Sequence, residues 1–430
     1  MTRRDLLVAG AAAGIVAGCG PLATRFTPAR TAVLRLDDPE ERVLNRVAYG
    51  PSSDDLADLK SLGREAWIDR QLAAAAEEPS HLILRLRPMD VLNNDAEELR
   101  DLPEEYVIRQ LNQASILRAV YSANGLQERM VEIWTDWFCI FGRKGHAAYR
   151  MGPEQNTVIR PHALGKFGDL LRASAHSPAM LAFLDNPFNS TATPNENYAR
   201  ELMELHTLGV KGGYSQKDIH EVARCFSGWG IEQRFLRHRG TYRFDPDRHD
   251  DGEKLVLGHR IPPGGGQSDA DKVLDILANH PATAHRVARR LGRRFLGDPH
   301  AKPVAKAESV FAKTGGDIRA TLEPILKSDA LVEGPPIFSR PFDFLVGTIR
   351  KSGGVTDGGS EIQDTLRGMG QPLYEWPMPD GYPDADGAWT GTMLARWNFV
   401  LDLAKGEIAG SSMPEETDRM ALLSPEAMWR

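Results

Sequence analysis

"NENYARELMELHTLGV" (residues 195–210) places apolar residues at helical spacing among an unusually dense set of polar side chains. Leu202, Met203 and Leu205 recur at the positions that share one face of a helix. Buried polar groups cost free energy unless they are paired. The segment therefore predicts a helix over 195–206 whose polar groups either face solvent or gather in a site.

One row of this expected helix consists of alternating charges. Glu196, Arg200 and Glu204 follow one another at intervals of four residues. Such rows form ion pairs along a solvated helix face and contribute a few tenths of a kcal/mol per pair, roughly. The row therefore favours a structural role, and Arg200 is a binding residue only if the helix lines a site.

A second set of side chains in the same segment is the better candidate for chemistry. Asn197 and Glu201 form a neighbouring row, and His206 lies on the apolar side after Leu202 and Met203. A histidine there is more often a core residue than a ligand. We keep Asn197 as a candidate binding residue and Glu201 and His206 as candidate catalytic residues.

Outward from this segment the chain reads as a succession of helices. Helical patterns span 104–123 and 126–141, a Ser177-Pro178 step divides two further helices, and Ser215 with Asp218 forms a capping box. The exception is 231–266, which is rich in turn residues and short β-like pieces. The expected fold class is mainly α, a multihelical globular core with a small β-hairpin-like excursion near 231–266.

The N-terminus predicts export and lipid anchoring. Arg3 and Arg4 precede an apolar run of about 12 residues, too short to span a bilayer, and "VAGC" ends at Cys19. The arginine pair resembles a twin-arginine (Tat) signal. We expect a signal peptide over 1–18, lipidation of Cys19, and a location on the periplasmic side of the envelope. A plain secretory signal with an incidental cysteine is the alternative.

The rest of the expected organisation is simple. A linker covers 19–37, a multihelical domain covers 38–408, and a C-terminal tail covers 409–430. The net charge of −7 argues against a nucleic-acid partner. Cys139 and Cys225 either form a disulfide, as periplasmic export permits, or remain buried thiols.

Reactive partners for the 195–206 helix would come from the excursion. "HDDGEK" supplies His249, Asp250 and Asp251 in an irregular segment, where functional groups are common. Imidazole and carboxylate suit a proton-shuttling pair or a divalent metal such as zinc, iron or manganese. We therefore expect His249 and Asp250 to be catalytic or metal-binding if this loop folds back onto the helix.

Two later segments are candidate contact surfaces. "MGQPLYEWPMPDGYP" carries Trp376 and Tyr382, which suit stacking on a sugar or peptide, or a loop pinned onto the core. "RVARRLGRRF" (286–295) is a basic stripe, either a solvated face or one turned to anionic lipid.

Several segments together resemble one family. They include "RVLNRVAYGP", "ERMVEIWTDWF", "HSPAMLAFLDN", "NENYARELMELHTLGV", "YSQKDIHEVARCFSGW", "FDPDRHDDGEKLVLG" and "HPATAHRVARRLGRRFL". In order along nearly the whole mature chain, they resemble the widespread bacterial family catalogued as domain of unknown function 1800. The resemblance implies export, a mostly helical fold and a companion exported protein as partner, but no established reaction.

The segment "WTDWF" (residues 134–138) departs from the family pattern. Members often have Trp-His-Asn-His-Phe there, whereas this chain has Thr135 and Trp137 at the two histidine positions. A metal or acid–base role of those histidines would be altered or lost, unless they only pack the core.

Two functions remain open from the sequence. The first is a hydrolytic or metal-assisted enzyme with a polar site from the 195–206 helix and the 249–251 loop. The second is a non-catalytic binding or assembly partner of another exported protein, with the aromatic loop and basic stripe as its interface.

Overall fold

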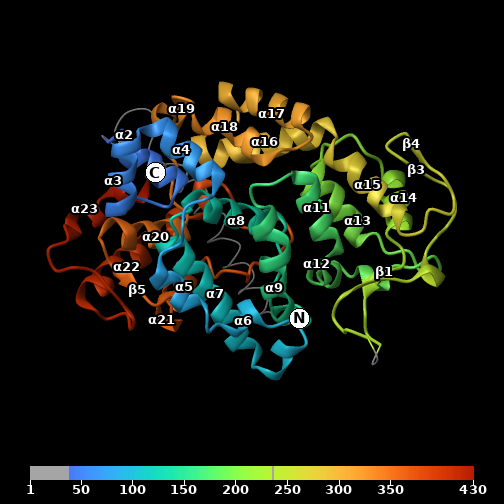
Figure 1. Cartoon of the computed structure of the whole chain (residues 1–430), viewed down its shortest axis with the longest axis horizontal. Helices are drawn as coiled ribbons and strands as arrows, with labels where there is room; N and C mark the ends of the chain where they lie inside the picture. Colours follow the sequence, from blue (N-terminus) through green and yellow to red (C-terminus); the bar gives the residue numbers. More distant parts are fainter. Residues whose placement is uncertain (1–37, 235–236) are drawn as a thin grey trace, which may run out of the picture.

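The computed structural model describes residues 38–234 and 237–430, so the expected signal peptide, linker and lipidated Cys19 lie outside the described residues. Within them the chain is mostly helical and its only sheets are three antiparallel two-stranded ones (Figure 1). The predicted mainly α class is confirmed. No helix of the described part is long and apolar enough to cross a membrane.

Helix α8 lies at the centre of the molecule (Figure 1). Gly125, its first residue, packs so closely on α2 that an added Cβ would lie 2.5 Å from the Ala48 Cβ. The elements before and around it are α2 (Pro39–Val47), α3 (Ser53–Leu62), α4 (Arg64–Ala73), α5 (Ser80–Leu86), α6 (Asp90–Asn93), α7 (Glu104–Tyr121), α8 (Gly125–Trp137) and α9 (Ala148–Glu154). The pattern predicted for 126–141 therefore ends earlier, at Trp137.

The next helices form one end of the molecule together with the β excursion (Figure 1). They are the π-helical η2 (Gln155–Ile159), α10 (Arg160–His162), α11 (Phe167–His176), α12 (Pro178–Phe183), α13 (Asn197–Glu201), the π-helical η4 (Leu202–Thr207), α14 (Gln216–Cys225) and α15 (Ser268–Ala278). The predicted break at Ser177-Pro178 is confirmed, with Ser177 capping α12. The Ser215–Asp218 capping box is also present.

The excursion consists of two hairpins. β1 (Trp229–Ile231) pairs with β2 (Tyr242–Phe244), and β3 (Lys254–Val256) pairs with β4 (His259–Ile261). The β-hairpin-like excursion predicted near 231–266 is thus confirmed. A third small sheet, β5 (Val355–Thr356) with β6 (Ser411–Ser412), was not foreseen.

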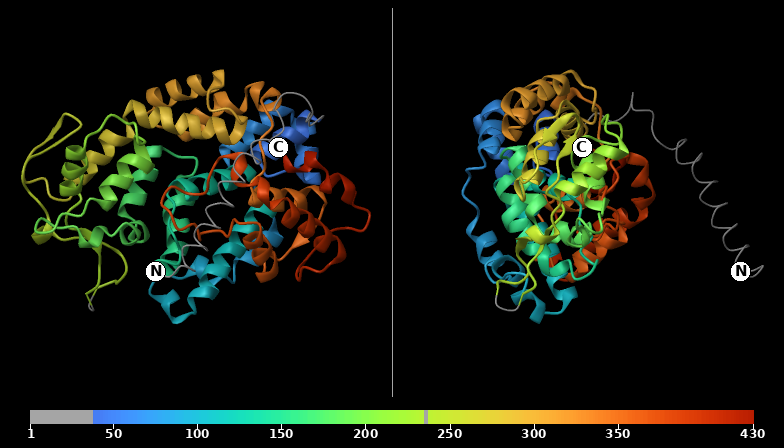
Figure 2. Two further views of the ribbon diagram at one scale, coloured as in Figure 1. Left: turned by 180° about the vertical axis from the view of Figure 1, so that it is seen from behind. Right: turned by 90° about the vertical axis from the view of Figure 1, so that its right-hand side faces the viewer.

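The C-terminal third crosses above α8 and closes the other end of the molecule, as the view from behind also shows (Figure 2). Its helices are α16 (Pro281–Leu296), α17 (Lys302–Thr314), α18 (Ile318–Leu326), α19 (Ala330–Glu333), α20 (Pro341–Lys351), α21 (Ser360–Gly368), α22 (Met393–Lys405) and α23 (Arg419–Leu423). The segment 409–430, expected as a tail, packs on this end: Trp429 bridges to Phe338, and Met428 is buried.

Candidate functional site

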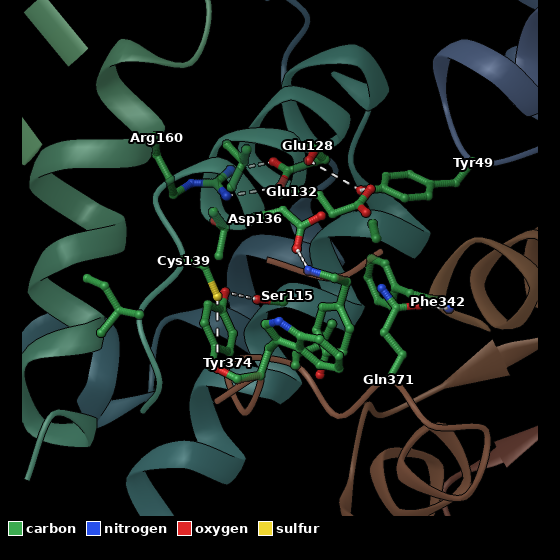
Figure 3. Close-up of a pocket in the computed structure, with 17 residues that line it drawn as sticks. Tyr49, Ser115, Glu128, Glu132, Asp136, Cys139, Arg160, Phe342, Gln371 and Tyr374 are labelled. Carbon is green, nitrogen blue, oxygen red and sulfur yellow. Dashed lines mark hydrogen bonds and ion pairs between the residues drawn. The ribbon is translucent and has the colours of Figure 1, made fainter. Parts of the chain in front are cut away.

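A pocket opens between α8 and the loop 371–382 (Figure 3). The enclosed part of the pocket has a volume of about 70 Å³, and counting the part that reaches solvent the volume is about 670 Å³. Its lining is mostly apolar and aromatic and comes from α7, α8, α20, the loop 371–382 and single residues of other segments. Its residues are Tyr49, Ser115, Ala119, Glu128, Val131, Glu132, Thr135, Asp136, Cys139, Ile140, Arg160, Phe342, Gln371, Leu373, Tyr374, Trp376 and Tyr382.

Three carboxylates of α8 form one row along the pocket (Figure 3). Glu128, Glu132 and Asp136 are spaced four residues apart, so they lie on the same helix face. All three side chains are largely buried, with exposed fractions of 7%, 12% and 7%. Unpaired carboxylates in such a place would be costly, so their partners decide what the row can do.

Each of these carboxylates is held by arginine. Arg160, just after the π-helical η2, donates two hydrogen bonds to Glu128. On α16, Arg294 lies 2.5 Å from Glu132 and Arg290 lies 3.1 Å from Asp136. The pairing is therefore that of two antiparallel helices, since a step of four residues forward on α8 matches a step of four back on α16.

The loop 371–382 is fixed to the same carboxylate row. The Tyr382 amide donates to Asp136 Oδ1 at 2.9 Å, and Arg340 bridges Asp136 Oδ2 at 2.6 Å to the Tyr382 carbonyl at 3.0 Å. Gly381 has φ +73° and approaches the Asp136 carbonyl so closely that a Cβ would lie 2.2 Å from its oxygen. Only glycine fits there, so the loop wall of the pocket is held in place.

Aromatic rings make up the wall opposite the carboxylates. Trp376 and Tyr382 are tilted against each other with ring centroids 4.9 Å apart. Tyr374 adopts a left-handed backbone conformation with φ +61°, and its hydroxyl lies 2.7 Å from Ser115 Oγ. A non-glycine residue in this region costs roughly 1–2 kcal/mol, so the surrounding contacts hold the Tyr374 ring in the pocket.

The phenols and the thiol that line the pocket are held in their neutral forms. Burial raises the pKa values of Tyr374 and Tyr382, so both phenols remain protonated. Burial also raises the pKa of Cys139, which keeps its thiol protonated and weakly nucleophilic.

Both described cysteines are free and buried, which settles the alternatives left open above. Burial raises the pKa of Cys225 to about 12. We expect neither Cys139 nor Cys225 to react with Ellman's reagent in the folded protein at mildly alkaline pH, and both to react after denaturation. The measurement is a thiol count on a Cys19→Ser chain; rapid reaction of one thiol before unfolding would contradict the buried placement.

The charged row of the opening segment is confirmed as an ion-pair row. Arg200 lies 3.2 Å from Glu196 and 3.8 Å from Glu204. Asn197 Nδ2 donates to the Leu184 carbonyl at 3.1 Å, which ties α13 to the end of α12. Arg200 and Asn197, the expected binding residues on this helix, thus make structural contacts within the protein.

Glu201 and His206 occupy different surroundings. Burial, helped by Glu204, raises the pKa of Glu201, and Asp380 of the loop acts in the same direction. His206 is buried in η4 against Phe138, with ring centroids 5.0 Å apart. Burial lowers the pKa of His206 to about 3, and neither ring nitrogen has a hydrogen-bond partner in the described part of the chain. His206 is therefore a neutral core residue, as the apolar spacing indicated.

The 249–251 loop is bound to α14 and α15. The Arg224 guanidinium donates to both oxygens of Asp250 and lowers the pKa of that carboxyl to about 2. His249 is buried, with Nδ1 2.8 Å from the Ser227 carbonyl and Nε2 3.5 Å from Asp269. No hydrogen bond or ion pair of the described residues joins this loop to Glu201 or His206. The 195–206 helix and the 249–251 loop, the two halves of the expected site, therefore belong to separate contact networks.

The suggested metal site has no cluster around it. Among residues 38–234 and 237–430, no group of three or more His, Cys, Asp or Glu side chains is arranged to hold a metal ion. His249 and Asp250 instead have their own protein partners, Ser227 and Arg224.

Of the residues proposed from sequence, the structure places Trp376 and Tyr382 in the pocket. The loop is pinned to the core, as one of the two alternatives expected, and stacking of its rings on a sugar or peptide stays a prediction. The expectation that the basic stripe faces solvent or lipid is wrong for three of its five arginines. Arg290 and Arg294 face inward onto α8 carboxylates, and Arg286 stacks on Trp137 at 4.2 Å.

Sequence reasoning missed the α8 carboxylates. The departure from the family pattern in "WTDWF" was one signal for this pocket. Thr135 lines the pocket directly and accepts a hydrogen bond from Gln155 at 2.9 Å. A histidine at position 135, as in related sequences, would therefore stand in this cavity. The spacing of Glu128, Glu132 and Asp136 was a second signal that was not used.

Comparison with known proteins yields one match. The family model described as "Protein of unknown function (DUF1800)" matches residues 42–428, nearly the whole described chain. Neither the curated proteins nor the solved structures contain a significant match. This match confirms the resemblance drawn from the sequence segments, and the chain belongs to the DUF1800 family.

Proposed function

We propose that this protein is an exported, lipid-anchored envelope protein that binds a small neutral sugar ring in the pocket between α8 and the loop 371–382. The observation that best supports this proposal is that aromatic rings line one side of the pocket and a row of carboxylates lines the facing helix. The rings are those of Trp376, Tyr382 and Tyr374. Aromatic faces pack on the C–H faces of a sugar, and carboxylate and amide oxygens accept from its hydroxyls.

Binding suits this geometry better than hydrolysis. A glycosidase needs one carboxyl that donates a proton to the leaving oxygen and a second that acts as base or nucleophile. Each of Glu128, Glu132 and Asp136 is instead held in an ion pair with an arginine. The enzyme hypothesis built on the 195–206 helix and the 249–251 loop stays a prediction. No contact between these two segments described above supports it.

The partner hypothesis loses part of the interface expected for it. Arg290 and Arg294 of the basic stripe are buried in ion pairs within the protein itself. Arg293 of the same stripe is exposed and Trp376 is half-buried, so binding of a companion exported protein there stays a prediction.

The binding proposal is tested by calorimetric titration of the Cys19→Ser chain with N-acetylglucosamine and N,N′-diacetylchitobiose. Saturable binding that is lost on filling the pocket with Ala119→Phe supports it. Ala119 lines the pocket from α7. Absence of binding by these and other neutral sugars at millimolar concentration, with the fold intact, would overturn it.

Export and anchoring make a separate prediction. Because thioether lipidation requires the cysteine at the cleavage site, Cys19→Ser is expected to release the protein from the membrane fraction. Replacing Arg3 and Arg4 with lysine is expected to retain most of the chain in the cytoplasm if the Tat route is used. Cell fractionation with immunoblotting measures both. Unchanged membrane association of the Cys19→Ser chain would contradict the lipid anchor.

A further inference from the structure

A second cavity lies behind the first, on the other side of Arg340 and Asp384. Its volume is about 940 Å³, counting the part open to solvent. Four arginines line it together with two aspartates and a wall of apolar residues. The lining is Arg293, Arg294, Arg340, Arg430, Asp384, Asp386, Gly297, Pro299, Pro336, Ile337, Phe338, Ala385 and Trp389. Pocket-lining arginines thus outnumber carboxylates two to one.

The ion-pair network behind this cavity is also unbalanced. It joins five arginine side chains to four carboxylates, all largely buried: Arg129, Arg290, Arg294, Arg340 and Arg430 with Glu132, Asp136, Asp343 and Asp384. Nearby, Arg46 is fully buried and bonds only to main-chain carbonyls. A buried excess of positive charge is costly without an anion.

Arg430 is the weakly paired member of this network. Its side chain is only 5% exposed, and the carboxylate in its ion pair, Asp343 at 3.3 Å, is shared with Arg129. Its Nη1 has no hydrogen-bond partner in the described part of the chain. Burial lowers the pKa of Arg430 to about 9, although Asp343 acts in the opposite direction. The guanidinium is therefore under-neutralised where it lines the cavity.

Arg293 supplies a further cation at the mouth. It is exposed and lies on α16 one residue before the buried Arg294, and its charge is among those that lower the pKa of Asp384. Guanidinium groups bind phosphate oxygens through paired N–H donors. Trp389 and Phe338 offer apolar contact for an organic group attached to such an anion.

We propose that the cavity lined by Arg293, Arg340 and Arg430 is a binding site for a phosphate group carried on a small organic molecule or a lipid headgroup. This site is independent of the sugar pocket. Arg340 separates the two, since it binds Asp136 on the first side and Asp384 on the second.

The test is calorimetric titration of the Cys19→Ser chain with inorganic phosphate and with glycerol 3-phosphate at constant ionic strength. Arg293→Gln and Arg430→Gln are each expected to weaken binding roughly tenfold or more, the loss of one charge-assisted hydrogen-bonding group. The matched control is Arg289→Gln, one turn earlier on α16, half-buried and bonded to His285 and His300 outside the cavity. It is expected to leave binding unchanged.

Sedimentation with phosphatidylglycerol vesicles separates the two sources of phosphate. Binding of glycerol 3-phosphate or of vesicles that is lost in Arg293→Gln supports the site. Which of the two binds shows whether the phosphate belongs to a small molecule or to a lipid headgroup. Because Arg293 is exposed, its variant remains informative if Arg430→Gln fails to fold. No saturable phosphate binding, equal loss in Arg289→Gln, or equal displacement by chloride would overturn the proposal. Retained phosphate binding in Trp376→Ala would show that this site stands apart from the sugar pocket.

Discussion

Asp136→Asn is expected to destabilise the protein by about 3–5 kcal/mol, the cost of removing one partner from a buried ion-pair network. Asp136 accepts hydrogen bonds from Arg290 at 3.1 Å, from Arg340 at 2.6 Å and from the Tyr382 amide at 2.9 Å. Asparagine keeps the shape and can still accept from the amide, but it leaves two buried guanidiniums with less compensation. The free energy of unfolding in urea, measured by circular dichroism, gives the value.

A matched control separates this effect from the general loss of a carboxylate. Asp364 pairs with Arg109 at 3.0 Å and has a side chain that is 53% exposed. Asp364→Asn is expected to change the free energy of unfolding by less than about 1 kcal/mol, as exposed pairs do. Equal losses in the two variants would mean that the α8–α16 network contributes no more than a surface pair.

Trp376→Ala is expected to weaken binding of N,N′-diacetylchitobiose by roughly 30-fold, equivalent to about 2 kcal/mol for a buried aromatic contact. Trp376 lies at the pocket wall, tilted against Tyr382, and its Nε1 donates to Asp380 at 3.0 Å. Removing its ring takes away the apolar face on which a sugar would rest. Titration calorimetry on wild type and variant measures the change.

Trp397→Ala is the matched control for that variant. Trp397 is a partly exposed tryptophan on α22 that donates to the Leu423 carbonyl and does not line the pocket. Its replacement is expected to leave the dissociation constant unchanged. If both variants lose affinity to the same degree, the sugar does not rest on Trp376.

Local features of this fold were predictable from the sequence because they depend on neighbouring residues. The capping box of Ser215 with Asp218 and the division at Ser177-Pro178 follow from side chains within a few positions. The hairpins of the excursion follow from turn residues in the same way. The π-helical continuation of the 195–206 helix was not predictable, since packing around Met203 and His206 sets it rather than local spacing.

The pocket could not be predicted from the sequence, because it depends on residues that are far apart along the chain. Its carboxylates are paired with arginines about 30 to 200 positions away along the chain, as with Arg160 for Glu128 and Arg340 for Asp136. Each helix showed its half of the pattern, three like charges at intervals of four residues. A stripe of that kind normally predicts a solvated face, and only the apposition of α8 with α16 shows that both stripes are buried against each other.

The most direct test of the central claim is a crystal structure of the Cys19→Ser chain with N,N′-diacetylchitobiose. The account predicts a sugar ring between α8 and the loop 371–382, stacked on Trp376, with hydroxyls within hydrogen-bond distance of Gln371 or the α8 carboxylates. Density for the sugar elsewhere on the protein, with only water in this pocket, would contradict the claim.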